Sequence, residues 1–413
     1  MPRQDPTRLA ILGAGPIGLE AALYARTLGL QVTVYERGRI AENMQRWGHV
    51  RLFSPFGMNS TSLGRAAIHA ELGRHEFPGD NDCITGREHR TVYLEPLAKT
   101  LGNLIHPETE VVQVGRRGFL KTEAAGEMRR GQQPFRLLLR DNKKIERVEE
   151  ADIILDCTGS YGRHRWLGDG GIPAIGERAA EPLIAYTLDD VLGERKNVYA
   201  GKTVLVVGGG YSAATTVCNL STLAGSNQDT WVTWLARCAG SQPIKRVAND
   251  PLRERDRLAV RANSLATRGD GNVEFHNQSV VETIETAGPD KGFKVTARVA
   301  GKPRSWEVDR IVGNVGNTPD NELYRELQIH ECYASLGPMK LAASLAKHAG
   351  GDCLTIGAQG PDTLRNPEPN FYIVGSKSYG RNAQFLLRTG FEQVREVFTL
   401  ITGKDHNLYQ ETR

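Results

Sequence analysis

Two glycine-rich segments, each directly after an apolar run, constrain the fold of this 413-residue chain more than any other feature. The first is Gly13-Ala14-Gly15-Pro16-Ile17-Gly18, which follows Leu9–Leu12. The second is Gly208-Gly209-Gly210-Tyr211-Ser212-Ala213, which follows Val204–Val207. Each pattern predicts a buried strand, a tight turn, and a helix whose free N-terminal amides hold a pyrophosphate. The chain is therefore expected to bind two dinucleotides.

The composition is that of a globular protein of two or three domains. Hydrophobic residues make up 39% and charged residues 24% of the chain, and the formal net charge is +4. The basic clusters are scattered and lack interleaved aromatic residues, so no nucleic-acid partner is expected. There is no apolar run of about 18 residues, and Met1–Asp5 lacks the core of a signal peptide. We therefore expect a cytoplasmic protein without a membrane segment.

The six cysteines include no Cys-x-x-Cys pair and no zinc-binding spacing. Histidine and acidic residues are not spaced as metal ligands either. Neither a redox dithiol of the Cys-x-x-Cys kind nor a bound metal is therefore predicted. Cys332 and Cys353 are close enough in sequence to form a redox pair, but ordinary reduced cysteines are the favoured interpretation.

The residue that ends the second strand indicates which nucleotide the first turn takes. A helix is expected over Leu19–Leu28, and the alternating segment Gln31–Tyr35 then predicts a strand that ends at Glu36 and Arg37. Glu36 lies 21 residues after Gly15, the spacing at which a carboxylate accepts hydrogen bonds from ribose hydroxyls. Because a carboxylate repels a 2′-phosphate, this position favours FAD or NAD over NADP.

The second turn carries different chemistry. Ala213 takes the place of the third glycine, where a methyl group is tolerated because that position governs helix–strand packing. The next strand, Trp231–Ala236, ends at Arg237, where the first half has its acid. A guanidinium there pairs with a 2′-phosphate, which favours NADPH. Lys245 and Arg246 either assist Arg237 or are solvated.

Strands farther along the chain complete a characteristic order. Short strands are expected over 110–114, 135–140 and 147–150, and the buried strand 151–159 ends at Thr158 and Gly159. Over nearly the whole chain, this order resembles the two-dinucleotide-binding flavoproteins. The resemblance implies an FAD contact at Thr158-Gly159. It also implies an α/β fold of two Rossmann-like, three-layer βαβ domains, the second inserted in the first, with β-meander crossovers. The expected domains are 1–165 and 311–413 for FAD and 166–310 for NADPH.

A finer resemblance concerns the chemistry. The Gly-x-Gly-x-Ser-Ala turn and the segment Trp47–Pro55 are similar to parts of flavin-dependent monooxygenases of the N-hydroxylating and Baeyer–Villiger type. The Phe-x-Gly-x-x-x-His signature of that group is missing, and Ser160–Trp166 occupies its neighbourhood with another spacing. The resemblance implies that NADPH reduces FAD, which then activates O2 to oxygenate a small-molecule substrate.

Two alternatives to oxygenation stay open. One is a reductase or oxidase that passes electrons to a quinone, a disulfide or O2. The other is a non-catalytic, redox-sensing flavoprotein, against which the intact second turn argues. The oligomeric state, a homodimer included, is also open.

The last part of the chain is expected to return to the FAD domain. A return strand is expected within Asp309–Asp320, then a strand over Asn370–Gly375 and a helix over Ala383–Ile401 that contains Gln384. In related flavoproteins an Asp follows the glycine equivalent to Gly375 and contacts the ribityl chain, whereas here Ser376 and Lys377 replace it.

Four side chains are weak candidates for a catalytic role. The helix N-terminus, with Lys377 or Arg381, is a candidate for stabilising negative charge on reduced flavin. Solvent or FAD phosphates are the alternative partners of these two cations. His49 and Arg51 lie in the segment that faces the flavin in the monooxygenases, and His49 is either a proton donor or a structural hydrogen-bond partner.

Overall fold

The computed structural model describes residues 7–227, 229–268, 271–348 and 352–410. Met1–Asp5, on which the expected absence of a signal peptide partly rests, lies outside this part of the chain. Contacts between residues divide the chain into two units. Unit 1 comprises Met1–Arg163 and Thr318–Arg413, and unit 2 comprises His164–Asn317.

A five-stranded parallel sheet forms the centre of unit 1, in the order β15-β7-β1-β2-β3. Side chains of β1 alternate between its two faces: Leu9 and Ile11 belong to one apolar core, and Ala10 and Leu12 belong to another. The sheet is therefore buried on both faces. Its strands are β1 (Arg8–Leu12), β2 (Gln31–Tyr35), β3 (Ile105–His106), β7 (Ile153–Asp156) and β15 (Phe371–Ile373).

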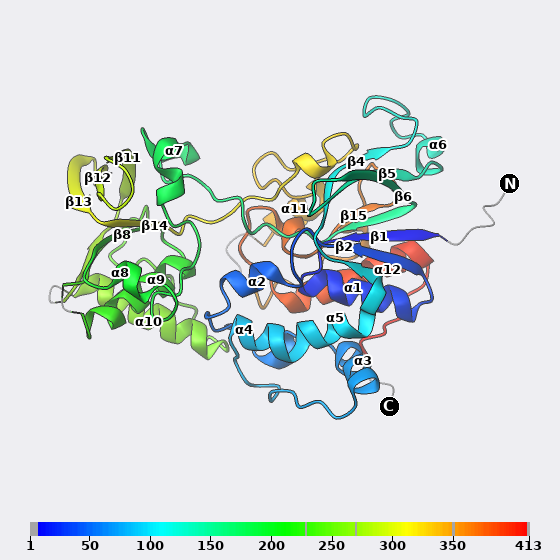
Figure 1. Cartoon of the computed structure of the whole chain (residues 1–413), viewed down its shortest axis with the longest axis horizontal. Helices are drawn as coiled ribbons and strands as arrows, with labels where there is room; N and C mark the ends of the chain where they lie inside the picture. Colours follow the sequence, from blue (N-terminus) through cyan, green and yellow to red (C-terminus); the bar gives the residue numbers. More distant parts are fainter. Residues whose placement is uncertain (1–6, 228, 269–270, 349–351, 411–413) are drawn as a thin grey trace. The chain divides into compact units, whose positions relative to one another are not determined.

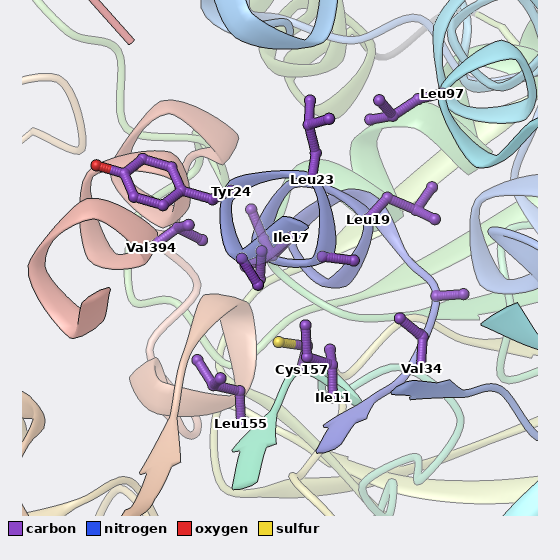
Figure 2. Close-up of a cluster of buried hydrophobic side chains, with 14 of the residues drawn as sticks. Ile11, Ile17, Leu19, Leu23, Tyr24, Val34, Leu97, Leu155, Cys157 and Val394 are labelled. Atoms are coloured by element: carbon purple, nitrogen blue, oxygen red, sulfur yellow. The ribbon is translucent and has the colours of Figure 1, made fainter. Parts of the chain in front are cut away.

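Helices cover one face of this sheet and an antiparallel meander covers the other (Figure 1). Figure 2 shows α1 lying over the sheet, with Ile11, Leu155 and Cys157 below it and Val394 of α12 beside it. The helices on this face are α1 (Pro16–Thr27), α3 (Ser62–Leu72), α5 (Glu95–Leu101) and α12 (Leu387–Thr402). The meander is β4 (Thr109–Arg116), β5 (Phe135–Asp141) and β6 (Glu146–Ala151). The other α-helices described in unit 1 are α2 (Glu42–Arg46), α4 (Gly86–His89), α6 (Met128–Gly131) and α11 (Met339–Ala346).

Unit 2 repeats this plan with a four-stranded parallel sheet in the order β10-β9-β8-β14. Val204 and Val206 of β8 face the helix-side core, and Leu205 and Val207 face the meander-side core. The sheet strands are β8 (Thr203–Val207), β9 (Trp231–Leu235), β10 (Val273–His276) and β14 (Arg310–Gly313), and the meander strands are β11 (Ser279–Thr286), β12 (Phe293–Val299) and β13 (Lys302–Val308). The helices are α7 (Glu177–Ala180), α8 (Lys196–Tyr199), α9 (Tyr211–Ala224) and α10 (Arg253–Thr267).

These two three-layer units confirm the predicted α/β class with Rossmann-like sheets and β-meanders. The sequence predicted the wrong sheet for one strand, however. β14 pairs in parallel with β8 inside unit 2, so Arg310–Gly313 is not a return strand of the first domain. The sequence predicted the domain boundaries at 165/166 and 310/311, whereas the chain re-enters unit 1 at Thr318.

Two helix starts also differ from the prediction. The first helix begins at Pro16 rather than Leu19, because a proline at the first helical position already has the required φ angle. The last helix begins at Leu387 rather than Ala383. Gly380 has a φ of +59°, and the Asn382 side chain accepts the backbone N–H of Gln384. These local turns keep Gln384 outside the helix.

None of the helices in the described part of the chain combines the length and the apolar character that a membrane span requires. Within the same residues, no three His, Cys, Asp or Glu side chains are arranged to hold a metal ion.

Candidate nucleotide-binding sites

The glycine turn of unit 1 contains two glycines that the protein's own backbone requires and one that it does not. Gly13 has a φ of +97°, and a Cβ there would stand 2.9 Å from the carbonyl oxygen of Cys157. A Cβ at Gly18 would stand 1.9 Å from the carbonyl oxygen of Gly13. A Cβ at Gly15 would meet no atom within 4 Å. The space in front of Gly15 is therefore open, as close approach of a ligand requires.

The N-terminus of α1 lies at this open space. Gly15 is the N-cap residue, Pro16 follows it, and no side chain of the described residues caps the first turn. The free backbone N–H groups and the positive end of the helix dipole fit a bound diphosphate. Ile17 contributes only its backbone here, because its side chain is buried in the core (Figure 2).

The Glu36 side chain is hydrogen-bonded to the backbone of this turn. One carboxylate oxygen accepts the N–H of Ala14 and the other accepts the N–H of Gly38, both at 2.8 Å. These bonds fix the carboxylate at the end of β2, and each oxygen retains a lone pair for a further donor such as a ribose hydroxyl. The neighbouring Arg37 is exposed.

Two adjoining cavities meet at the turn. Their volumes are about 190 and 80 Å³, and both are lined by Gly13, Glu36, Arg37, Asn43 and Thr158. The smaller cavity extends to Gly15 and Pro16 of the turn, and the larger one extends along the chain from Gly159 to Arg163. The predicted residues Gly13, Gly15, Glu36, Arg37, Thr158 and Gly159 thus line two cavities that share part of their walls.

Sequence reasoning missed several residues of this site. Asn43 follows no recognisable spacing, and Val111 and Val112 reach the larger cavity from the meander. Tyr161 and Arg163 lie beyond the Thr-Gly turn and also line it. Their position only two and four residues after Gly159 is the sequence feature that could have indicated Tyr161 and Arg163 as site residues.

Lys377 lines the larger cavity but is already paired. Its Nζ lies 2.5 Å from a carboxylate oxygen of Asp156 and 3.1 Å from Thr158 Oγ1. Its ammonium also lies 4.9 Å from the centre of the Tyr324 ring, and burial raises the pKa of that phenol. Burial, reinforced by the negative charge of Asp156, raises the pKa of the Cys157 thiol well above its ordinary value.

The other weak candidates lie outside the residues that line the two cavities. Arg51 is exposed and donates to the backbone carbonyl of Cys83. Arg381 has an exposed side chain, and its backbone N–H donates to the Ser335 carbonyl. Gly375, with a φ of +75°, donates its N–H to Gln393. The roles of His49, Arg51, Arg381 and Gln384 toward a cofactor stay predictions.

The turn of unit 2 has the same construction. Gly208 has a φ of +149°, and a Cβ there would stand 2.4 Å from the carbonyl oxygen of Asn314. Gly210 is the N-cap of α9, and a Cβ there would meet no atom within 4 Å. The buried Trp234 indole donates to the Gly208 carbonyl at 2.8 Å and so holds the turn in place. Tyr211, Ser212 and Ala213 form the first turn of α9.

Strand register corrects the placement of Arg237. Leu12 pairs with Tyr35 in unit 1, and Val207 pairs with Leu235 in unit 2. Ala236 is therefore the counterpart of Glu36, and Arg237 is the counterpart of Arg37. The acid of the first site is replaced by a methyl group, with a guanidinium one residue later.

The role of Arg237 toward a 2′-phosphate in unit 2 stays a prediction. Arg237 is exposed, and no side chain among the described residues pairs with it. Arg246, by contrast, makes two hydrogen bonds to Asp256, at 2.8 and 3.0 Å, and Lys245 is exposed. A groove of about 490 Å³ between α9 and α10 contains no residue of the glycine turn, so we do not assign the nucleotide to it.

All six cysteines are free thiols. A hydrogen bond with Ser335 lowers the pKa of Cys332, which lies on a loop beside α11. Redox activity of Cys332 with Cys353 stays a prediction.

Comparisons with known proteins agree with this geometry. The family model described as pyridine nucleotide-disulphide oxidoreductase matches residues 10–125, which include the first glycine turn. No curated protein matches the chain in sequence. Many solved structures share its fold.

Three of them illustrate the range of chemistry. Bacillithiol disulfide reductase from Bacillus cereus has a TM-score of 0.69 and 18% identity, over 97% of this chain and 99% of that one. The FAD-bound cadaverine monooxygenase of desferrioxamine biosynthesis from Erwinia amylovora has a TM-score of 0.65 and 14% identity, over 96% and 94%. Ornithine N-hydroxylase from Kutzneria sp. 744, with reduced FAD, NADP+ and L-ornithine, has a TM-score of 0.64 and 16% identity, over 97% and 99%. At such identities the likeness concerns the fold, which reductases and hydroxylases share.

Proposed function

We propose that the chain is an FAD-dependent oxidoreductase that takes its electrons from NADPH. The observation that carries the proposal is the pair of open glycine turns with different residues beside them. Glu36 suits the unphosphorylated ribose of FAD, and Ala236 with Arg237 suits the phosphorylated ribose of NADPH. The FAD in the cadaverine monooxygenase structure and the reduced FAD and NADP+ in the ornithine N-hydroxylase structure support this assignment.

Each part of the first site has a definable task toward FAD. The amides at the start of α1 would hold the diphosphate, and the Glu36 carboxylate would accept from the ribose. Thr158 and Gly159 would border the nucleotide from β7. When bound, the flavin supplies the redox chemistry, accepting a hydride and passing electrons on. The protein then has to bind, orient and exclude water, which agrees with the lack of a predicted nucleophile.

For the fate of the electrons we propose oxygenation of a small organic substrate by O2. The Ser212-Ala213 form of the second turn resembles the monooxygenases, and six free thiols without a Cys-x-x-Cys pair give no resident dithiol to relay electrons. The two hydroxylases of similar fold are consistent with this proposal.

A reductase is the second candidate, and a specific observation favours it. The family match over residues 10–125 and the fold of the bacillithiol disulfide reductase both point to reduction of a disulfide. A low-molecular-weight disulfide needs no dithiol in the protein if it reacts at the flavin itself. A redox sensor without turnover is the least favoured reading, because it has no use for the second turn.

Reduction and turnover distinguish the three functions. Purified protein should be yellow, and NADPH should bleach it in the absence of O2. An oxygenase then consumes NADPH and O2 together with an amine substrate, releases less hydrogen peroxide than NADPH consumed, and incorporates isotopically labelled oxygen into product. A reductase oxidises NADPH anaerobically only when a disulfide or quinone is added. A sensor is not reduced, and protein that refuses added FAD would refute the whole proposal.

A further inference from the structure

An ion pair without any solvent exposure lies in the wall of the FAD site. The side chains of Asp156 and Lys377 are both 0% exposed, and their charged atoms are 2.5 Å apart. Burying two charges costs free energy that their attraction only partly offsets, and hydrophobic replacements of such pairs are often as stable. Stability of the fold alone is therefore a weak reason for this pair to exist.

Unit 2 shows that the fold does not require the pair. Asp156 is in register with Leu12, the residue before the first glycine turn. The corresponding partner of Val207 in unit 2 is Gly313. A Cβ at Gly313 would lie 2.8 Å from the Leu167 side chain and 2.9 Å from the Tyr186 ring, so this corner is filled by uncharged groups. The same strand–turn–helix frame thus closes without a charge.

The pair holds together the two chain segments that border the larger cavity. Asp156 accepts both the hydroxyl and the N–H of Thr158, at 2.6 and 3.1 Å. Lys377 donates to the same hydroxyl and comes from the turn after β15. Gly159 and Ser376 are neighbours as well, since a Cβ at Gly159 would lie 3.4 Å from Ser376 Oγ. The direction of Thr158 toward the cavity therefore depends on both charged residues.

Lys377 also contributes to the charge balance of the larger cavity. Four carboxylates, Glu36, Glu110, Asp320 and Glu322, line the larger cavity against three cations, Arg37, Arg163 and Lys377. Lys377 is the cation among them that is fully buried. A ligand with a diphosphate brings further negative charge, and loss of Lys377 would leave the buried charge of Asp156 uncompensated behind the cavity wall.

We propose that Lys377 and Asp156 form a positioning pair for FAD, in which Lys377 offsets negative charge along the larger cavity and both residues orient Thr158. The inference rests on the proposed function, because it assumes that unit 1 binds FAD. It assigns the two residues opposite electrostatic effects. Removing the cation weakens binding of the anionic cofactor, whereas replacing the Asp156 carboxylate by an amide removes the negative charge, keeps an acceptor for the Thr158 hydroxyl, and does not weaken binding.

Binding of FAD to apoprotein, followed by flavin fluorescence at low salt, tests the pair. We expect Lys377→Met to weaken FAD binding by about 30-fold or more, because the anionic cofactor would then bind beside the uncompensated buried charge of Asp156. Asp156→Asn should bind FAD at least as tightly as the wild type, because a cation is freed. Lys377→Arg should stay within about tenfold of the wild type, because the charge is kept.

Arg130→Met is the matched control. Arg130 makes an equally buried ion pair with Glu368, with side chains 1% and 0% exposed and charged atoms 2.8 Å apart, away from both cavities. It should lower the thermal stability of the apoprotein and leave the FAD affinity within about twofold.

The inference is overturned if Asp156→Asn weakens FAD binding as much as Lys377→Met, or if the affinity of all variants simply follows their thermal stability. Should Lys377→Met not fold, the sign of the Asp156→Asn effect still decides, since weaker binding contradicts the proposal. A wild-type chain that binds no FAD refutes the proposed function instead, so the two failures are distinguishable.

Discussion

Units 1 and 2 share one plan of strand, glycine turn, helix and meander, yet they differ at four matched positions. Gly18 corresponds to Ala213 and Glu20 to Thr215 in the helices. At the strand ends, Glu36 corresponds to Ala236 and Asp156 to Gly313. The positions that keep the frame are glycines facing backbone and alternating apolar residues. Three of the four differing positions, Glu20, Glu36 and Asp156, are acidic in unit 1 and neutral in unit 2, so acidic side chains distinguish the two nucleotide sites.

The largest expected effect separates the two turns. Gly15→Val should abolish FAD binding, weakening it on the order of a hundredfold or more through loss of diphosphate hydrogen bonds. Folding should be unaffected, because the space at Gly15 is open and its φ is −82°. Gly210→Val should leave FAD bound and prevent its reduction by NADPH. Flavin absorbance before and after anaerobic NADPH checks both variants. Loss of FAD from Gly210→Val would contradict the assignment of the two turns.

The second expected effect is a pH dependence of folding stability that arises in unit 1. Glu20 is buried in α1 and bonded to Tyr93 and Thr61, and burial raises its pKa from 4.5 to about 7. Between these values the folded chain holds a proton that the unfolded chain releases, so this residue makes stability fall as pH rises. Above pH 7 the loss of unfolding free energy that Glu20 causes levels off at about 3 kcal/mol.

Glu20→Gln should remove this cost, so that denaturant unfolding finds it as stable as the wild type near pH 5 and markedly more stable at pH 8. The exposed Glu71→Gln on α3 is the control and should change nothing. Parallel pH profiles of Glu20→Gln and wild type would contradict the shifted pKa.

A smaller effect concerns the third glycine position. Gly18→Ala forces a Cβ to within 1.9 Å of the Gly13 carbonyl unless α1 shifts, so it should cost about 1–3 kcal/mol and weaken FAD binding. The reverse change Ala213→Gly adds chain entropy to the unfolded state and removes one buried methyl group, so it should cost about 1–2 kcal/mol. Thermal unfolding measures the loss of stability in each variant. Equal losses would mean that α1 and α9 pack equally closely against their glycine turns.

The smallest expected effect sharpens the cofactor assignment. Arg237→Ala should lower the preference for NADPH over NADH by about tenfold, the worth of one charge-assisted hydrogen bond. Arg37→Ala, at the matched place in unit 1, should leave that preference unchanged. Steady-state kcat/KM with each nucleotide provides the ratio. A ratio that Arg37→Ala changes and Arg237→Ala does not would reverse the assignment.

Local patterns predicted most of the frame. Apolar and β-branched runs identified β1 and β8 before a glycine turn and β2 and β9 before a charged strand end, because both faces of these strands are buried by nearby elements. The same reasoning misplaced Arg310–Gly313, since a short buried strand carries no mark of the sheet that it joins. The start of α12 was missed because a side-chain turn at Asn382 outweighed helix propensity.

The candidate site was predicted in part for the same physical reason. Glu36 and the glycines stand at fixed distances along one βαβ segment, so their spacing is visible in the sequence. The Asp156–Lys377 pair joins residues 221 positions apart. An acid in a buried strand indicates a partner, but nothing local indicates which cation supplies it. Register, not spacing, also decided that Ala236 rather than Arg237 matches Glu36.

The interrupted course of unit 1 has a consequence for biosynthesis. A ribosome releases β1, β2 and β7 first and then all of unit 2, and only afterwards releases the edge strand β15 and helix α12. All strands of unit 2 have been synthesised by residue 317, so unit 2 can fold while unit 1 still lacks β15 and α12. Until Lys377 emerges, Asp156 has no countercharge. If the proposed positioning pair is needed for binding, the flavin nucleotide would bind only after Lys377 has been synthesised.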